Sequence, residues 1–141
     1  MPTRTSTAQW RGDLPKGSGT ISLGSGAYEG QYSFSSRFES GTGTNPEELI
    51  AAAHAGCYSM ALANMLAQAG HVATSVRTAA AVHLERTDDG LAITRIDLTT
   101  TAEVPGIDAA EFDTHAQAAK AGCPVSRALA AVEITLTATL S

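Results

Sequence analysis

Hydrophobic and polar residues alternate in three short stretches of the first 40 residues, which are otherwise rich in Gly, Ser and Thr. An alternation with a period of two is typical of a strand with one buried face. The same alternation returns in three longer stretches after residue 70, and the turn sequence TDDG joins the first two of them. The predicted strands are residues 8–12, 19–23, 32–38, 72–85, 91–104 and 132–140.

A long helix is predicted between the two groups of strands. Asn45 is a suitable N-cap, and Pro46 suits the first helical position. Glu48 lies three residues after the cap, which is the acidic position of a capping box. Gly70 is a typical end for the helix, which therefore has about 24 residues and a length of about 36 Å.

Two shorter helices are predicted near the carboxyl end. The first runs from Asp108 to about Lys120, and the second begins at Pro124. Mostly antiparallel strands combined with helices in this order predict an α+β fold. A chain of 141 residues has the usual size of one domain, so we expect a single domain over residues 1–141.

The long predicted helix is apolar almost all the way round, because no Asp, Glu, Lys or Arg occurs from Leu49 to Val76. One sheet covers only one face of such a helix, so we expect a second copy of the chain to cover the rest in a dimer. A membrane span is the alternative, but the segment is dominated by Ala, which contributes little to insertion. Four polar residues also interrupt it: His54, Ser59, Asn64 and Gln68. We therefore expect no membrane-spanning helix.

The net charge and the first residues of the chain indicate which binding partners and which cell compartment to expect. A net charge of −5 provides no basic surface for nucleic acid or for an anionic membrane. The first 13 residues, MPTRTSTAQWRGD, lack the apolar core of a secretory signal. We therefore expect the protein in the cytoplasm, where a permanent structural disulfide is disfavoured.

Cys57 and Cys123 are the only cysteines, and four interpretations of this pair compete. Both can be small buried hydrophobic residues, which is the plainest interpretation. A structural disulfide would stabilise the fold by about 4 kcal/mol in the chain-entropy model, but the compartment argues against it. A metal site has little support, because His54 and Cys57 share a helix face but no further paired ligands complete the set. Redox chemistry requires one reactive thiolate and a second thiol that resolves its product.

The position of Cys123 favours redox chemistry. It directly precedes Pro124 at a predicted helix start, where backbone N–H groups and the helix dipole lower the pKa of a thiol. Cys57 lies in the middle of the long helix, where burial raises the pKa of a thiol. Cys57 therefore needs a cation from elsewhere in the fold in order to react.

Arg37 is a candidate for that cation, because it is the only Lys or Arg among residues 17–76 and lies shortly before the long helix. An acidic residue at the start of the helix, Glu47 or Glu48, can hold its guanidinium group in a bidentate pair. Spacing alone leaves this arrangement, and the choice between the two glutamates, open.

Several runs along the chain resemble the osmotically inducible protein C (OsmC) family. They are SRFE at 36–39, GTNPEELI at 43–50, AAHAGCYSMAL at 52–62, VPGID at 104–108 and KAGCPVS at 120–126. The run WRGD at 10–13 also resembles the amino terminus of the family, so the likeness covers the whole chain in order. The related Ohr branch shares the NPE and Cys motifs, whereas the RFE and VPGID runs point to OsmC proper.

The resemblance implies a thiol-dependent peroxidase that reduces organic hydroperoxides in defence against oxidative or osmotic stress. It implies an intertwined homodimer, with antiparallel sheets wrapped around long central helices. Cys57 matches the peroxidatic cysteine of the family, Cys123 its resolving cysteine, and Arg37 and Glu47 its active-site pair. No cofactor or metal is implied, and the expected reductant is a dithiol, which in relatives is a lipoyl group on a carrier protein.

The chain departs from the family pattern at Gly56 and Tyr58, where relatives often carry Ala and Phe, and the Tyr58 hydroxyl is expected to affect substrate fit. His54 is expected to be a buried, hydrogen-bonded histidine rather than a metal ligand or a base. Two further interpretations stay open. One is a redox-sensing or ligand-binding dimer of the same fold with little turnover, and the other is a structural dimer with inert cysteines.

Overall fold

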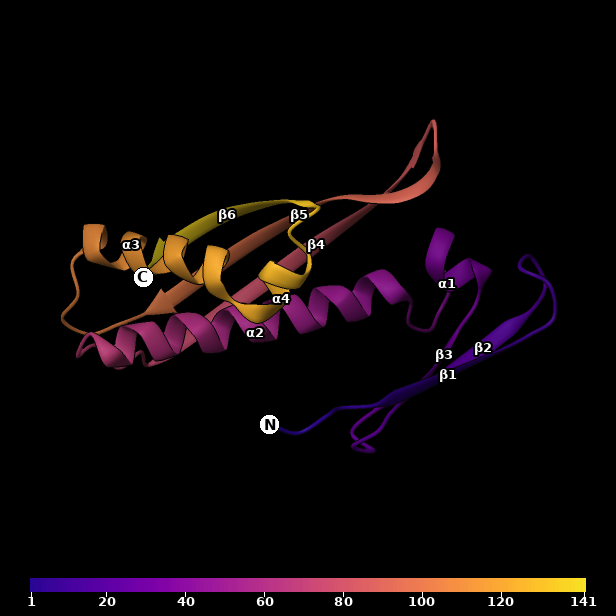
Figure 1. The fold of residues 1–141 in the computed structure, drawn as a ribbon, viewed down its shortest axis with the longest axis horizontal. Helices are drawn as coiled ribbons and strands as arrows, with labels where there is room; N and C mark the ends of the chain where they lie inside the picture. The colour runs from indigo at the N-terminus through magenta and orange to yellow at the C-terminus, as the bar shows by residue number, and fades with distance from the viewer. The chain divides into compact units, whose positions relative to one another are not determined.

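The computed structural model describes residues 1–141, which form two compact units, Met1–Leu49 and Ile50–Ser141. Each unit contains its own three-stranded sheet (Figure 1). The longest helix, α2 (Pro46–Gln68), begins in the first unit and continues into the second. The expectation of a single domain over residues 1–141 stays a prediction.

The first unit is an antiparallel sheet followed by a short helix. Its strands β1 (Ser6–Arg11), β2 (Ser18–Leu23) and β3 (Glu29–Tyr32) pair in chain order. The Trp10 and Tyr32 rings lie 5.2 Å apart between centroids. Gly19 faces both residues in the register, and a side chain there would collide with the Tyr32 ring. The close packing of these rings therefore depends on a glycine in β2.

The prediction of a strand over residues 32–38 is wrong beyond Tyr32, because residues Phe34–Phe38 form helix α1. Ser33 caps this helix, and its hydroxyl accepts a hydrogen bond from the Ser36 amide at 3.2 Å. The Ser36 hydroxyl accepts one from the Ser33 amide at 2.9 Å, which completes a capping box. These reciprocal bonds outweigh the strand preference of the aromatic residues.

Helix α2 begins where the sequence predicts. The Asn45 side chain accepts a hydrogen bond from the Glu48 amide at 2.8 Å, and Pro46 is the first helical residue. The Glu48 carboxylate accepts a hydrogen bond from the Thr44 hydroxyl at 2.7 Å. The helix ends at Gln68, and Gly70 has a φ of +89°, a left-handed conformation that glycine adopts without strain.

The second unit contains a mixed sheet in the order β4-β5-β6. Strands β4 (Ser75–Thr87) and β5 (Gly90–Glu103) form an antiparallel hairpin, as predicted, although β4 begins three residues later than expected. The alternation predicts mostly antiparallel strands, and strand β6 (Glu133–Leu140) is the exception, because it pairs parallel to β5. The antiparallel sheets that the resemblance implies are therefore wrong at this edge. The connection from β5 to β6 contains two helices, α3 (Ala109–Gly122) and α4 (Pro124–Ala128), and such a crossover permits parallel pairing.

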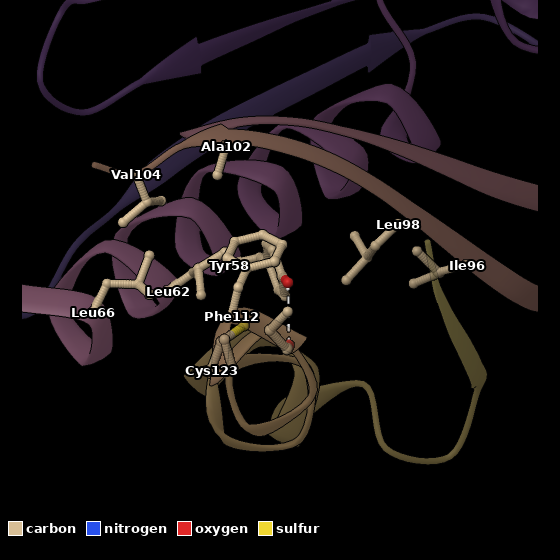
Figure 2. Packing of buried hydrophobic residues seen from close by; sticks show 11 residues of the cluster. Tyr58, Leu62, Leu66, Ile96, Leu98, Ala102, Val104, Phe112 and Cys123 are labelled. Atoms are coloured by element: carbon tan, nitrogen blue, oxygen red, sulfur yellow. Dashed lines mark hydrogen bonds between the residues drawn. The ribbon is translucent and has the colours of Figure 1, made fainter. Parts of the chain in front are cut away.

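The core of the second unit lies between its sheet and its helices (Figure 2). One face of α2 is fully buried, with His54, Tyr58, Leu62 and Leu66 spaced four residues apart. Tyr58, Leu62 and Leu66 form a single cluster with buried residues of β5, α3 and the α3–α4 junction, among them Ile96, Leu98, Ala102, Phe112, Ala116, Ala119 and Cys123. Packing of this kind fixes the rotation of α2 against the sheet.

The opposite face of α2 is largely uncovered in the single chain. Only 22% of the residues in its most apolar 18-residue window are buried, and the Met60 side chain is exposed. By length and by a mean hydropathy of 1.3, α2 could cross a membrane, although core helices of globular proteins pass the same test. Because one face of α2 is packed against the core, we interpret it as a protein-packing helix with one face left to cover.

Candidate functional site

The two cysteines meet at the core of the second unit. Cys57 projects from the middle of α2 and is partly buried, whereas Cys123 is fully buried between α3 and α4. Both are free thiols, and they are close enough for each to alter the pKa of the other. Cysteines 66 positions apart in the sequence are therefore neighbours in the fold.

Cys123 occupies the junction of two helices. Its amide donates a hydrogen bond to the Ala119 carbonyl at 3.0 Å, which ends α3. Its sulfur accepts a hydrogen bond from the Ser126 amide at 3.3 Å, which makes it the N-cap of α4. Pro124 follows as the first residue of α4, so the N-cap position predicted for Cys123 is confirmed.

The pKa values of the two thiols are shifted in opposite directions. Burial raises the pKa of Cys123, but the Ser126 hydroxyl and amide stabilise the Cys123 thiolate by hydrogen bonds, so the pKa lies below its ordinary value. Burial raises the pKa of Cys57, and a backbone hydrogen bond from Val125 only partly opposes this effect. Cys123 is thus the more acidic of the two thiols. Within this unit, no neighbouring cation lowers the pKa of Cys57 and stabilises its thiolate.

Arg37 and Glu47 form the ion pair for which the sequence provided two candidate carboxylates. Arg37 Nη2 lies 2.7 Å from Glu47 Oε1, and Arg37 Nε lies 3.2 Å from Oε2. The Glu47 side chain is only 10% exposed, whereas the Arg37 side chain is 33% exposed, so the carboxylate of this bidentate pair is the part shielded from solvent. Glu47, in the first turn of α2, is therefore the partner of Arg37 on α1, and the neighbouring Glu48 is not.

Arg37 and Glu47 belong to the first unit, and the two cysteines belong to the second. The structure pairs the residues within each set, Arg37 with Glu47 and Cys57 with Cys123. The approach of Arg37 to Cys57, and the catalytic roles of all four residues, stay predictions.

Two residues beside Cys123 were not expected to take part in the site. His54 is fully buried, and its Nε2 lies 2.7 Å from the Ser126 hydroxyl. The same hydroxyl lies 3.3 Å from the Cys123 sulfur. His54 is buried and hydrogen-bonded as predicted, but only through one nitrogen, because Nδ1 has no partner. The one signal in the sequence was the spacing of Cys123 and Ser126, which is that of an N-cap and its third helical residue.

Tyr58 is a core residue. Its side chain is fully buried, and its hydroxyl donates a hydrogen bond to the Ala116 carbonyl of α3 at 3.1 Å (Figure 2). Burial raises the pKa of Tyr58 above its ordinary value. The extra hydroxyl therefore joins α2 to α3, and its expected effect on substrate fit stays a prediction.

No group of three or more His, Cys, Asp or Glu side chains lies close enough together to hold a metal ion. The chemistry available within the second unit is that of two neighbouring thiols, one of them acidic. Such a pair can pass between the dithiol and disulfide states when one sulfur is first oxidised.

Comparison with known proteins gives consistent matches. The OsmC-like protein family matches residues 39–137. The peroxiredoxin OsmC of Escherichia coli (strain K12) is 56% identical over 130 residues, which make up 92% of this chain and 90% of that protein. The peroxiredoxin OsmC of Shigella flexneri matches to the same extent.

Solved structures show the same fold at lower identity. The organic hydroperoxide resistance protein OsmC of Legionella pneumophila matches with a TM-score of 0.73 and 22% identity over 96% of each chain. The organic hydroperoxide resistance protein OhrB of Bacillus subtilis matches with a TM-score of 0.70 and 22% identity, over 97% of this chain and 98% of that one. The expected α+β fold with two sheets and a long central helix is confirmed.

Proposed function

Because the chain belongs to the OsmC-like protein family, we propose that it is a thiol-dependent peroxidase that reduces organic hydroperoxides to alcohols. The observation that carries this proposal is the meeting of Cys57 and Cys123, both as free thiols, in the core of one unit. The 56% identity to a peroxiredoxin over 92% of the chain supports the same activity.

In the first step, the Cys57 thiolate attacks the outer oxygen of the hydroperoxide. The S–O bond forms as the O–O bond breaks, Cys57 becomes a sulfenic acid, and the alkoxide takes up a proton to leave as the alcohol. Burial disfavours the Cys57 thiolate, so a cation has to stabilise it, and Arg37 is assigned that role. The bidentate pair with Glu47 holds the guanidinium group in one orientation, which also suits it to stabilise the leaving alkoxide.

In the second step, the Cys123 sulfur attacks the sulfenic sulfur of Cys57. The S–S bond forms, the S–O bond breaks, and water leaves. An external dithiol then reduces the disulfide by exchange, and a lipoyl group on a carrier protein is the proposed source. The pKa of Cys123 is lowered from its ordinary value, which suits this step because the sulfur has to give up its proton in order to attack.

We further propose an intertwined homodimer in the cytoplasm. The support comes from α2, whose inner face is buried while the Met60 side chain on another face is 77% exposed. An apolar surface along a helix of 23 residues is typical of an interface between chains. A second copy of α2 is the proposed cover.

The test of this function is a single oxidation. One equivalent of cumene hydroperoxide is added to the reduced protein, the reaction is stopped at intervals, and mass spectrometry identifies the state of each thiol. We expect rapid formation of a Cys57–Cys123 disulfide, and a trapped sulfenic acid when Cys123→Ser is used. The matched control is Cys57→Ser, in which Cys123 should stay reduced.

Two outcomes would contradict the proposal in different ways. If both thiols stay free for minutes, the protein is not a peroxidase. If the disulfide forms once but neither dithiothreitol nor dihydrolipoamide supports repeated turnover, the redox-sensing dimer becomes the better interpretation.

A further inference from the structure

A continuous row of hydrogen bonds leads away from the Cys123 sulfur into the core. The sulfur lies 3.3 Å from the Ser126 hydroxyl, and that hydroxyl lies 2.7 Å from His54 Nε2. All three side chains are at most 4% exposed, so water competes little for these bonds. The row joins α4 to α2 across 72 positions of sequence.

The arrangement sets the direction in which each group donates. A neutral Cys123 thiol donates to the Ser126 oxygen, and the Ser126 hydroxyl can then donate only to His54 Nε2. In the tautomer with an unprotonated Nε2, the Ser126 hydroxyl donates to that nitrogen and the ring proton is on Nδ1, which has no partner. Burial lowers the pKa of His54, which keeps the ring neutral at neutral pH.

A histidine in this position is costly if its role is only structural. One buried nitrogen is left unpaired, although unpaired buried polar groups are rare in folded proteins. The other nitrogen contacts a hydroxyl whose only further side-chain partner is a reacting sulfur. The contact from Nε2 to that hydroxyl therefore places the ring where it can exchange a proton with the sulfur through Ser126.

We propose that Ser126 and His54 carry the proton of Cys123 during disulfide formation, with Ser126 in contact with the sulfur and His54 acting through Ser126. This inference rests on the proposed function, because it concerns the step in which Cys123 attacks the sulfenic acid of Cys57. Ser126 is then a catalytic residue, and His54 is a positioning residue that also accepts the proton.

The step balances as follows in atoms and charge. As the sulfur of Cys123 bonds to the sulfur of Cys57, its proton passes to the Ser126 oxygen and the Ser126 proton passes to His54 Nε2. The S–O bond of Cys57 breaks, and the departing hydroxide takes a proton from solvent to leave as water. His54 then returns its proton to solvent, so the net products are the disulfide and one water molecule.

The same hydrogen bonds assist the reduction of the Cys57–Cys123 disulfide. When an incoming dithiol breaks the disulfide and Cys123 leaves as a thiolate, the Ser126 hydroxyl and amide donate to its sulfur. An open hollow reaches Ser126 beside Lys120 of α3 and Arg127 of α4, and it provides a route to solvent. The other ionisable groups near the row are Cys57 and Tyr58 on α2 and Asp113 on α3.

The experiment separates the two chemical steps. The variants are Ser126→Ala, which removes the hydroxyl but keeps the amide, and His54→Gln, whose amide can bond to Ser126 but cannot take up a proton. Rapid quenching with a thiol-blocking reagent after one equivalent of cumene hydroperoxide gives the rates of Cys57 oxidation and of disulfide formation. Ser126→Thr keeps a hydroxyl and serves as the rescue variant.

We expect both variants to slow disulfide formation by at least about tenfold, at the low end of what general acid–base groups contribute. Cys57 oxidation should change by less than about twofold, and Ser126→Thr should restore most of the rate of disulfide formation. The control is Ser59→Ala, also on α2, which loses the hydrogen bond that its hydroxyl donates to Thr78 of β4 and should change neither rate. Equal slowing of both steps, or no slowing of disulfide formation, would overturn the inference.

A second readout does not depend on peroxide chemistry. In a Cys57→Ser background, the pH dependence of Cys123 alkylation by iodoacetamide reports the pKa of that thiol directly. We expect Ser126→Ala and His54→Gln to move this profile to higher pH, and an unmoved profile would overturn the inference. If the profile moves but the unaltered chain never forms a disulfide, the proposed function fails while the hydrogen-bonded row stands.

Discussion

At the scale of single residues, the site depends on how each charge or thiol is surrounded. Glu47 and Glu48 are adjacent, yet only Glu47 pairs with Arg37, because Glu48 turns to the Thr44 hydroxyl. Cys57 and Cys123 have the same chemistry, yet their pKa values move in opposite directions because only Cys123 receives bonds from Ser126. Sequence reasoning identified the residue types, and the family resemblance selected Glu47. The pairing itself is a property of the folded chain.

Replacement of Glu47 tests the orientation of Arg37. Glu47→Gln removes the carboxylate that accepts three bonds from the guanidinium group. We expect Cys57 oxidation by cumene hydroperoxide to slow by about 10- to 100-fold, because a misplaced charge no longer stabilises the thiolate or the leaving alkoxide. Stopped-flow or rapid-quench kinetics would measure the rate.

The neighbouring carboxylate provides the matched control. Glu48 is exposed, so Glu48→Gln should leave the rate of Cys57 oxidation within about twofold of that of the unaltered chain. An equal loss in both variants would show that the helix start, rather than the bond to Arg37, had been damaged.

At the scale of elements, local signals explain most of the helices and strands. Asn45 and Pro46 start α2, and Asp108 caps α3 by accepting from the Glu111 amide at 2.8 Å. Alternation alone fails at residues 34–38, because the reciprocal Ser33–Ser36 bonds form a helix there. The failure matters for function, since the short helix α1 carries Arg37.

The cap of α1 can be tested through its effect on Arg37. Ser33→Ala removes the hydroxyl that accepts from the Ser36 amide, at a cost of about 1 kcal/mol in the free energy of unfolding. We expect α1 to fray and Cys57 oxidation to slow several-fold, because Arg37 lies in the last turn of α1. Urea denaturation and rapid-quench kinetics would measure the two effects.

Another serine hydroxyl, in an exposed turn, provides the comparison. Ser25→Ala removes the hydroxyl that accepts a hydrogen bond from the Ala27 amide at 3.3 Å. It should leave the free energy of unfolding and the rate of Cys57 oxidation close to those of the unaltered chain. A Ser33→Ala protein with full peroxidase rate would mean that α1 holds Arg37 without its cap.

At the scale of the whole molecule, the apolar helix α2 has more hydrophobic surface than its own unit covers. Its inner residues complete a core with the sheet and α3, while Met60 is 77% exposed. The charge pattern anticipated this excess, since no charged side chain occurs from Leu49 to Val76. We propose that a second copy of the chain covers this surface in a homodimer.

A charge placed on the exposed face of α2 should prevent association. We expect Met60→Glu to shift the protein from dimer to monomer, because an unpaired carboxylate at the centre of an apolar interface is costly to bury. Size-exclusion chromatography with light scattering would measure the mass. The control is Leu91→Glu, which replaces a 49% exposed apolar residue at the β4–β5 hairpin and should leave the dimer intact. A Met60→Glu protein that stays dimeric would place the interface elsewhere.

Local sequence patterns were enough to predict the order of most elements, the starts of α2 and α3, and the N-cap that Cys123 provides for α4. These features depend on residues within a few positions of one another, such as Asn45 with Glu48 and Cys123 with Ser126. Tertiary structure alone decided the parallel pairing of β6 and the bond between His54 and Ser126. Both depend on where a crossover returns the chain, and a contact across 72 positions leaves no periodic pattern in the sequence.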